Sequence, residues 1–210
     1  MGQASNRRMS REESQAQTRE RLVEAARSAV VRNGFGAASI RDIAEAAGFS
    51  QGAFYSNFQG KEDVLLELMR RHMAQEVIQL TEVLDAADRS AESALEGVRR
   101  WAATLNTDAD WSMFAVELQL QANRSATFAV AYGEVREVHR GQLGRIVARF
   151  FDLLELEPPD EPGQLAMGFM AMANGMALHR LSQRPDPSGR LIVLFLEGLV
   201  AIARARQVAR

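Results

Sequence analysis

The segment from Ser39 to Lys61 constrains the fold of this chain more than any other part of the sequence. Apolar residues recur there at positions 40, 43, 44 and 47, which is the spacing of one face of a helix. Ser39 precedes that face, and Asp42 lies three residues after Ser39. This arrangement is typical of a capped helix start. Gly48 is expected to end the helix, because a residue without Cβ readily adopts the left-handed conformation.

A second short helix is predicted directly after that turn. Ser50 can cap it, and it is expected to run from Gln51 to Asn57. Phe54 and Phe58 are four residues apart and face one way, which leaves the polar residues of the helix on other faces. Two helices joined by such a turn form a helix–turn–helix, which places its second helix in the major groove of DNA.

The segment resembles the DNA-binding end of TetR-like (tetracycline-repressor-like) bacterial transcriptional regulators. Residues 18 to 35 resemble the first helix of that family, whereas residues 66 to 210 match only in length and helical character. Phe49, Gln51 and Gly60 depart from the usual residues, and the first two bear on which DNA sequence is read. The matching positions are Ser39, Ile43, Ala44, Ala47, Gly48, Ser50, Gly52, Tyr55, Asn57, Phe58, Lys61 and Val64 or Leu65.

The resemblance implies an all-α fold with two domains. Residues 1–61 would form a three-helix DNA-binding domain, with residues 1–10 as a disordered arm, and residues 62–210 a helical effector-binding and dimerisation domain. Apolar periodicity and the breaks at Asn, Ser and Pro clusters predict the helices. Their expected ranges are Ser10 or Thr18 to Gly34, Lys61 to about Leu84, 90–105, 109–122, 126–156, 161–183 and 188–207.

Composition excludes several classes of protein. The chain has 210 residues and no cysteine, so neither a disulfide scaffold nor a thiolate metal site is expected. Its start has no apolar signal core, and the longest apolar run, 191–202, is interrupted by Glu197 and is too short for a bilayer, which needs about 20 residues. We therefore expect a cytoplasmic protein with no membrane partner.

Charge is unevenly distributed along the chain. Residues 1–61 hold nine Lys and Arg and six Asp and Glu, a net charge of +3. Residues 62–210 hold the other sixteen Lys and Arg and twenty-one Asp and Glu, a net charge of −5. A basic end on an acidic body suits a protein that presents one face to phosphates. The net charge of the whole chain, −2, does not show this difference between its two parts.

The resemblance implies roles for individual residues of the helix–turn–helix. Phosphate contacts are expected from Tyr55 and Lys61, with Ser39 and Arg41 also within reach of the backbone. Gly52 would let the protein backbone approach DNA closely, and Ser50 is a further contact or only a cap. Base edges are expected to be read by Gln51, Ala53, Ser56 and Asn57.

Each of these roles has a structural alternative. Tyr55 would alternatively be a surface tyrosine packed on the first helix, and Lys61, the only lysine of the chain, a solvated side chain. Gly52 would then merely cost the helix about 1 kcal/mol.

The second domain is implied to sense a small, largely apolar molecule, with the fourth helix transmitting the signal. Bulky and adaptable side chains there permit a pocket, although a stripe of Met and aromatic residues is also the pattern of an ordinary core. The residues expected to bind the effector are Trp101, Trp111, Phe114, Glu117, Tyr132, Met170 and Asn174.

The last helix is apolar on nearly all sides, so one face is left over after its own core is satisfied. We expect a two-fold dimer formed by this helix and the preceding one, with recognition helices about 34 Å apart on a near-palindromic operator. The expected interface residues are Gly168, Gly175, Leu178, Leu191, Leu194, Phe195, Gly198 and Ile202.

Other functional classes find less support in the sequence. Three scattered histidines, the absence of a thiol and the absence of nucleophile or phosphate-loop motifs predict no catalysis, no metal and no cofactor. A DNA-binding structural protein without an effector would have a solidly packed body. An activator remains as compatible with the sequence as a repressor.

Overall fold

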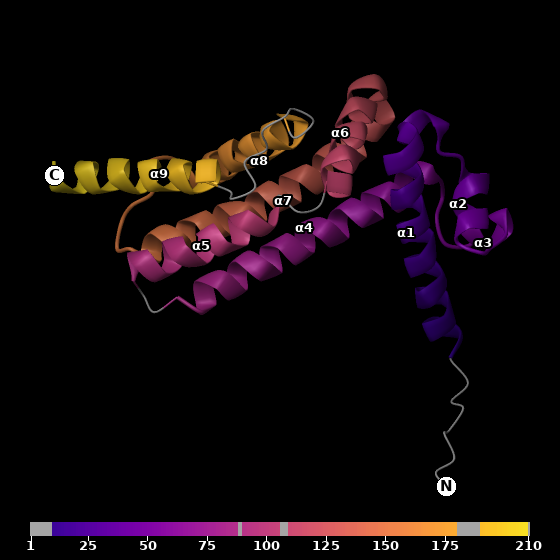
Figure 1. Ribbon diagram of the computed structural model, residues 1–210, viewed down its shortest axis with the longest axis horizontal. Coiled ribbons are helices and arrows are strands. Elements are labelled where there is room, and N and C mark those ends of the chain that lie inside the picture. Colours follow the sequence, from indigo (N-terminus) through magenta and orange to yellow (C-terminus); the bar gives the residue numbers. More distant parts are fainter. Residues whose placement is uncertain (1–9, 88–89, 106–108, 180–189, 210) are drawn as a thin grey trace, which may run out of the picture. The chain divides into compact units, whose positions relative to one another are not determined.

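The computed structural model describes residues 10–87, 90–105, 109–179 and 190–209, all of whose regular secondary structure is helical (Figure 1). This confirms the predicted all-α class. The chain divides into two compact units, Met1–Leu68 and Met69–Arg210. The boundary therefore falls within a helix, a little later than the predicted end of the first domain at residue 61.

Unit 1 contains α1 (Arg11–Ala37), α2 (Ile40–Ala46), α3 (Gln51–Tyr55) and the start of α4 (Lys61–Asp85). A capping box begins α1: the Ser10 hydroxyl accepts from the Glu13 amide at 3.1 Å, and the Ser10 amide donates to the Glu13 carboxylate at 2.7 Å. Gly34 has φ 78°, so the predicted helix end is a kink, after which helical turns continue to Ala37. The predicted disordered arm lies almost wholly outside the described residues.

The turn between α2 and α3 follows the prediction. Gly48 has φ 76°, the left-handed conformation that ends α2. The Ser50 hydroxyl accepts from the Ala53 amide at 3.2 Å and so caps α3. α3 ends at Tyr55, two residues before the predicted Asn57, because Ser56 already serves as its C-cap.

Helices α1 to α4 share one apolar core in unit 1. One apolar face of α1 is buried, as are the apolar faces of α2 and α3, and in Figure 1 α2 and α3 lie beside α1. Burial of these faces holds the two short helices in place, since helices of this length are not stable alone. The side chains that are fully or almost fully buried include Leu22, Ala26, Val30, Ile43, Ala44, Phe54, Phe58, Val64 and Leu65.

Unit 2 contains the rest of α4 with α5 (Ala91–Leu105), α6 (Ala109–Arg124), α7 (Ala126–Leu153), α8 (Pro162–His179) and α9 (Arg190–Val208). α7 packs against α6 and α8, and α5 packs against α9. α7 ends three residues before the predicted 156, where Glu155 takes φ 53°. Across the described ranges, no helix is both long and apolar enough to cross a membrane.

Candidate DNA-binding surface and ligand cavity

The exposed surface of α3 carries most of the side chains predicted to read DNA. Gln51, Gly52, Tyr55 and Ser56 are exposed, while Phe54, on the opposite face, is fully buried. The Tyr55 side chain is 57% exposed, and its ring meets the Phe54 ring edge to face with centroids 5.7 Å apart. Anchoring one helical face in the core therefore leaves the other face free for a partner.

Asn57 and Ala53 are only half-exposed. The Asn57 side-chain amide donates to the Ala53 carbonyl at 2.8 Å, and its Oδ1 is buried without a hydrogen-bond partner. Asn57 thus closes the C-terminal end of α3 with the amide that was predicted to read bases. Ser56 also bonds inward, since its hydroxyl donates to the Gly52 carbonyl at 2.9 Å.

Arg19 of α1 holds this end of α3, a role that sequence reasoning missed. Its guanidinium donates to the Asn57 carbonyl at 2.5 Å and lies 4.2 Å from the centroid of the Phe58 ring. It also approaches the Glu67 carboxylate of α4 at 3.8 Å. One cation thereby connects α1, the end of α3 and α4.

A second cation of α1 lies at the turn itself. The Arg21 guanidinium is 4.9 Å from the centroid of the Phe49 ring, and its Nη2 lies 3.0 Å from the point where a Cβ on Gly48 would stand. Phe49, a departure from the family pattern, therefore supplies an aromatic face for Arg21. The sequence signal was the pairing of an arginine in the first helix with an aromatic residue at this turn.

Ser39 and Arg41 are exposed at the start of α2. The Ser39 hydroxyl accepts from the Asp42 amide at 3.1 Å and donates to the Asp42 carboxylate at 2.6 Å, so it is a helix cap as predicted. The Arg41 Nε donates to Glu45 at 2.8 Å, and this hydrogen bond and charge raise the pKa of Arg41 above its ordinary value.

Lys61 is turned inward. Its ammonium donates to the backbone carbonyls of Phe35 and, at 2.8 Å, of Ala38, and lies 4.4 Å from the Phe35 ring centroid. Burial lowers the pKa of Lys61, and the charge of Glu62 acts in the opposite direction. Two of the three N–H donors of the predicted phosphate contact are thus used inside unit 1.

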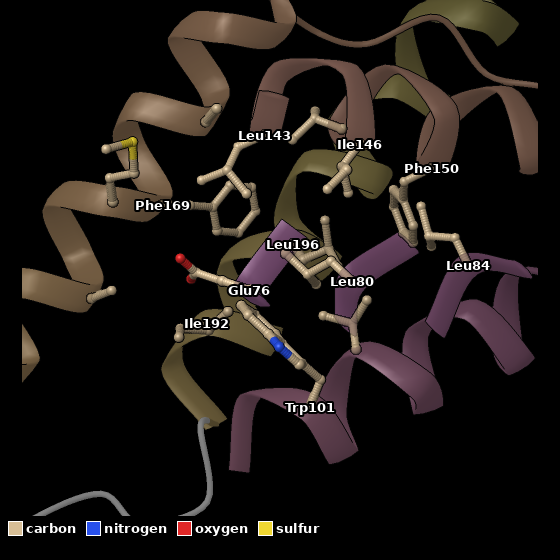
Figure 2. A pocket seen from close by; sticks show the side chains of 15 residues that line it. Glu76, Leu80, Leu84, Trp101, Leu143, Ile146, Phe150, Phe169, Ile192 and Leu196 are labelled. Carbon is tan, nitrogen blue, oxygen red and sulfur yellow. The ribbon is translucent and has the colours of Figure 1, made fainter. Parts of the chain in front are cut away.

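Unit 2 contains a partly open cavity with a volume of about 90 Å³. Figure 2 shows its almost entirely apolar wall, contributed by α4, α5, α7, α8 and α9. Two of the predicted effector-binding residues, Trp101 and Met170, line it. Further lining side chains include Leu80, Ile146, Phe150, Phe169 and Ile192.

One carboxylate interrupts this apolar wall. Glu76 of α4 lines the cavity, and its Oε2 lies 3.0 Å from Nε2 of His139 on α7. His139 is only 3% exposed, and its Nδ1 has no hydrogen-bond partner. Sequence reasoning did not place this pair, although His139 follows Tyr132 by two helical turns and therefore shares its buried face.

The other predicted effector residues do not line this cavity. Trp111 stacks on His72, with ring centroids 3.5 Å apart, and Phe114 is fully buried. Tyr132 donates to the Gln119 side chain at 3.2 Å. Glu117 is half-buried on α6, and Asn174 is exposed on α8.

An exposed apolar stripe runs along α9. Leu191, Leu194, Phe195 and Ile202 are all exposed, whereas the opposite face of the helix is buried. Gly198 belongs to the same stripe, and a Cβ added there, or at Gly175 of α8, would meet nothing within 4 Å. A Cβ on Gly168 would touch the Phe195 ring at 3.6 Å, and the side chain of the predicted residue Leu178 lies outside the described structure.

Comparison with known proteins agrees with this geometry. A family model described as bacterial regulatory proteins, tetR family, matches residues 22–68. The helix–turn–helix-type transcriptional regulator YwcC of Bacillus subtilis strain 168 is 34% identical over 79 residues, which are 37% of this chain. The match spans only about a third, 34%, of the length of that curated relative.

Solved structures share the whole fold. A structure assigned to the TetR family from Mesorhizobium loti MAFF303099 aligns with a TM-score of 0.71 and 20% identity, covering 92% of this chain and 98% of the other. A TetR-family structure from Rhodococcus sp. gives 0.74 at 16% identity, covering 88% and 98%. The fatty acid degradation regulator FadR from Bacillus halodurans gives 0.68 at 17% identity, covering 84% and 94%.

At such identities the solved structures show a common fold, while the family match lies on the helices that form the helix–turn–helix. Residues 22–68 therefore match the tetR family of bacterial regulatory proteins, and the chain as a whole shares its fold with solved TetR-family structures.

Proposed function

We propose that this protein is a cytoplasmic, ligand-responsive repressor that binds a near-palindromic operator as a homodimer and is released by a small, largely apolar effector. The observation that carries the proposal is the exposed face of α3, on which Gln51, Gly52 and Tyr55 project from a helix whose other face is buried. The function is one of binding, not catalysis.

On DNA, we assign base reading to Gln51, Ala53 and Ser56 and phosphate contacts to Tyr55, Ser39 and Arg41. Gln51 is exposed at the first position of α3, where a carboxamide can make paired hydrogen bonds to adenine. The Ser50 hydroxyl caps α3, and the Ser50 side chain is exposed, so that it can also contact DNA. Lys61 and Asn57 mainly stabilise the fold of unit 1, because their side chains donate hydrogen bonds to its backbone carbonyls.

Dimerisation through α8 and α9 is supported by the exposed stripe of α9. Four large apolar side chains and Gly198 share one face there, and such a patch is a common feature of protein interfaces. Asn174 is exposed on α8 and does not line the cavity of unit 2. Two copies related by a two-fold axis would present two recognition helices to DNA.

The effector role is supported by the cavity of unit 2. Apolar cavities with a few polar groups are typical ligand sites, whereas a purely structural body would be packed solid. α4 contributes Lys61 to unit 1 and Glu76 to unit 2 within one continuous helix. A ligand that prefers the DNA-free geometry would lower operator affinity by about 1–3 kcal/mol of coupling.

The test is to select bound duplexes from a random DNA pool and titrate the selected operator by fluorescence anisotropy. The proposal expects a near-palindromic site, a protein dimer in the complex and release by an apolar compound. A site without two-fold symmetry, bound by a single protomer, would contradict the dimeric mode of binding. Transcription from the operator in a purified system distinguishes a repressor from an activator.

A further inference from the structure

We propose that the cavity of unit 2 binds amphiphilic amines, molecules with an apolar body and one protonated amino group, and that Glu76 is the counter-charge for that group. The inference rests on the effector role proposed above and names the class of ligand. It follows from the contrast between an apolar wall and a single carboxylate in it.

The wall determines the body of the ligand. Aliphatic and aromatic side chains from five helices surround the space, and Figure 2 shows the Glu76 carboxylate as the acidic group among them. A ligand gains free energy there by removing apolar surface from water, at about 25 cal/mol per Å². A strongly polar body would lose its hydration without finding partners.

The polar partner of Glu76 determines the charge that fits. His139 is buried and contacts Glu76 through Nε2, while its Nδ1 has no partner. An N–H at Nδ1 would need an acceptor, so this geometry suits an imidazole whose single proton is on Nε2 and is donated to Glu76. The pair then carries one negative charge, which a cation beside the carboxylate would neutralise.

The carboxylate retains capacity for that cation. Two carboxylate oxygens provide about four acceptor positions, and the contact with His139 occupies one of them. Trp101 also lines the cavity and can present an aromatic face, to which ammonium groups are attracted. Its Nε1 is buried without an acceptor, which leaves it available to a ligand oxygen.

A fatty acid is the opposing candidate, because it has the same apolar body with the opposite charge. Its carboxylate would stand in the same low-dielectric space as Glu76, where like charges repel strongly. Neutral alcohols would donate one hydrogen bond to Glu76 without the charge attraction. The three head groups therefore give three different expected affinities.

The experiment is isothermal titration calorimetry of the full chain at neutral pH with n-octylamine, n-octanol and n-octanoate. The amine is expected to bind at least about tenfold more tightly than either of the others, a difference of about 1.4 kcal/mol. Glu76→Gln should weaken the amine about tenfold and change n-octanol by less than about twofold, because it removes the charge and keeps the shape. Binding of n-octanoate at or above the affinity of the amine would overturn the proposal, as would no binding of the amine.

Two control variants locate the effect. Glu82→Gln removes the same charge from an exposed position of α4 and should leave all three affinities unchanged. Ala173→Leu adds bulk to the cavity wall and should weaken all three probes, with Glu76 intact. If Glu76→Gln did not fold, unequal weakening of the three head groups by Glu76→Asp, with loss confined to the amine, would still support the assignment, and equal weakening would refute it.

Measurement without DNA separates this inference from the proposed function. Binding of the amine through Glu76 with no change in operator affinity would refute the effector role and keep the ligand class. Release of the operator by n-octanoate, with no binding of n-octylamine, would refute the ligand class and keep the effector role.

Discussion

The Lys61 ammonium lies 4.4 Å from the centroid of the Phe35 ring and donates a hydrogen bond to the Phe35 carbonyl. It bonds to the Ala38 carbonyl as well, so the first residue of α4 satisfies backbone acceptors at the end of α1. The only lysine of the chain therefore stabilises the contact between the start of α4 and the end of α1. This assignment differs from the phosphate contact that the family resemblance implies, and the two can be separated.

Lys61→Met keeps the apolar stem and removes the ammonium. We expect the free energy of unfolding to fall by about 1–3 kcal/mol, because two carbonyls lose a charged donor. The slope of log affinity for DNA against log salt should stay nearly constant. A slope reduced by about one per protomer, with stability unchanged, would restore the phosphate role.

Arg41→Gln is the matched variant for the salt dependence. Arg41 is 70% exposed and its pair with Glu45 contributes little to stability. We expect its loss to reduce the salt slope by about one per protomer and to leave thermal unfolding unchanged. Equal slopes for Arg41→Gln and wild type would show that Arg41 does not contact phosphate.

Gly48→Ala and Gly52→Ala test the two glycines of the helix–turn–helix. Gly48 has φ 76° and a Cβ there would stand 3.0 Å from Arg21, so alanine should destabilise the fold by about 1–2 kcal/mol. Gly52 is helical and its Cβ would meet only the Ser50 hydroxyl at 3.6 Å, so alanine should stabilise by up to about 1 kcal/mol. Thermal unfolding measures both changes.

Operator titration with Gly52→Ala then tests how closely the backbone of α3 approaches DNA. We expect this more stable variant to bind its operator more weakly, because the added methyl group projects from the exposed face. Unchanged affinity would mean that DNA does not come close to Gly52.

Leu194→Glu tests the dimer. Leu194 is 59% exposed in the apolar stripe of α9, and a charge buried there on association should weaken the dimer by roughly a hundredfold. Val138→Glu is the control, since Val138 is 64% exposed on α7, outside the stripe. Sedimentation equilibrium at micromolar concentration measures both, and a monomeric wild-type protein would contradict the dimer.

Gln51→Ala and Tyr55→Phe should affect DNA binding differently. Gln51→Ala is expected to cost about 1–3 kcal/mol at one base pair of each half-site and to relax preference there. Tyr55→Phe keeps the ring on Phe54 and removes the exposed hydroxyl, so it should weaken all sequences alike. Competition between selected and random duplexes distinguishes the two patterns.

Local sequence patterns predicted the elements of this protein well. The spacing of Ile43 and Ala44, the cap at Ser39 and the turn at Gly48 all act within a few residues, and each is present as predicted. The exposed apolar face of α9 could also be predicted from the sequence. The helix is apolar on nearly all sides, and only one of its faces can pack against the core of its own protomer. Such features depend on neighbouring residues and on the helical period alone.

The tertiary structure decided which partner each polar side chain takes. Sequence position could not show that Lys61 reaches carbonyls at the end of α1, or that Asn57 bonds back to α3. Nor could it bring Glu76 and His139, from helices distant in sequence, together at an apolar cavity. The physical reason is that a helical pattern fixes which face of each helix is buried, whereas the packing of one helix on another fixes which atoms meet across that face.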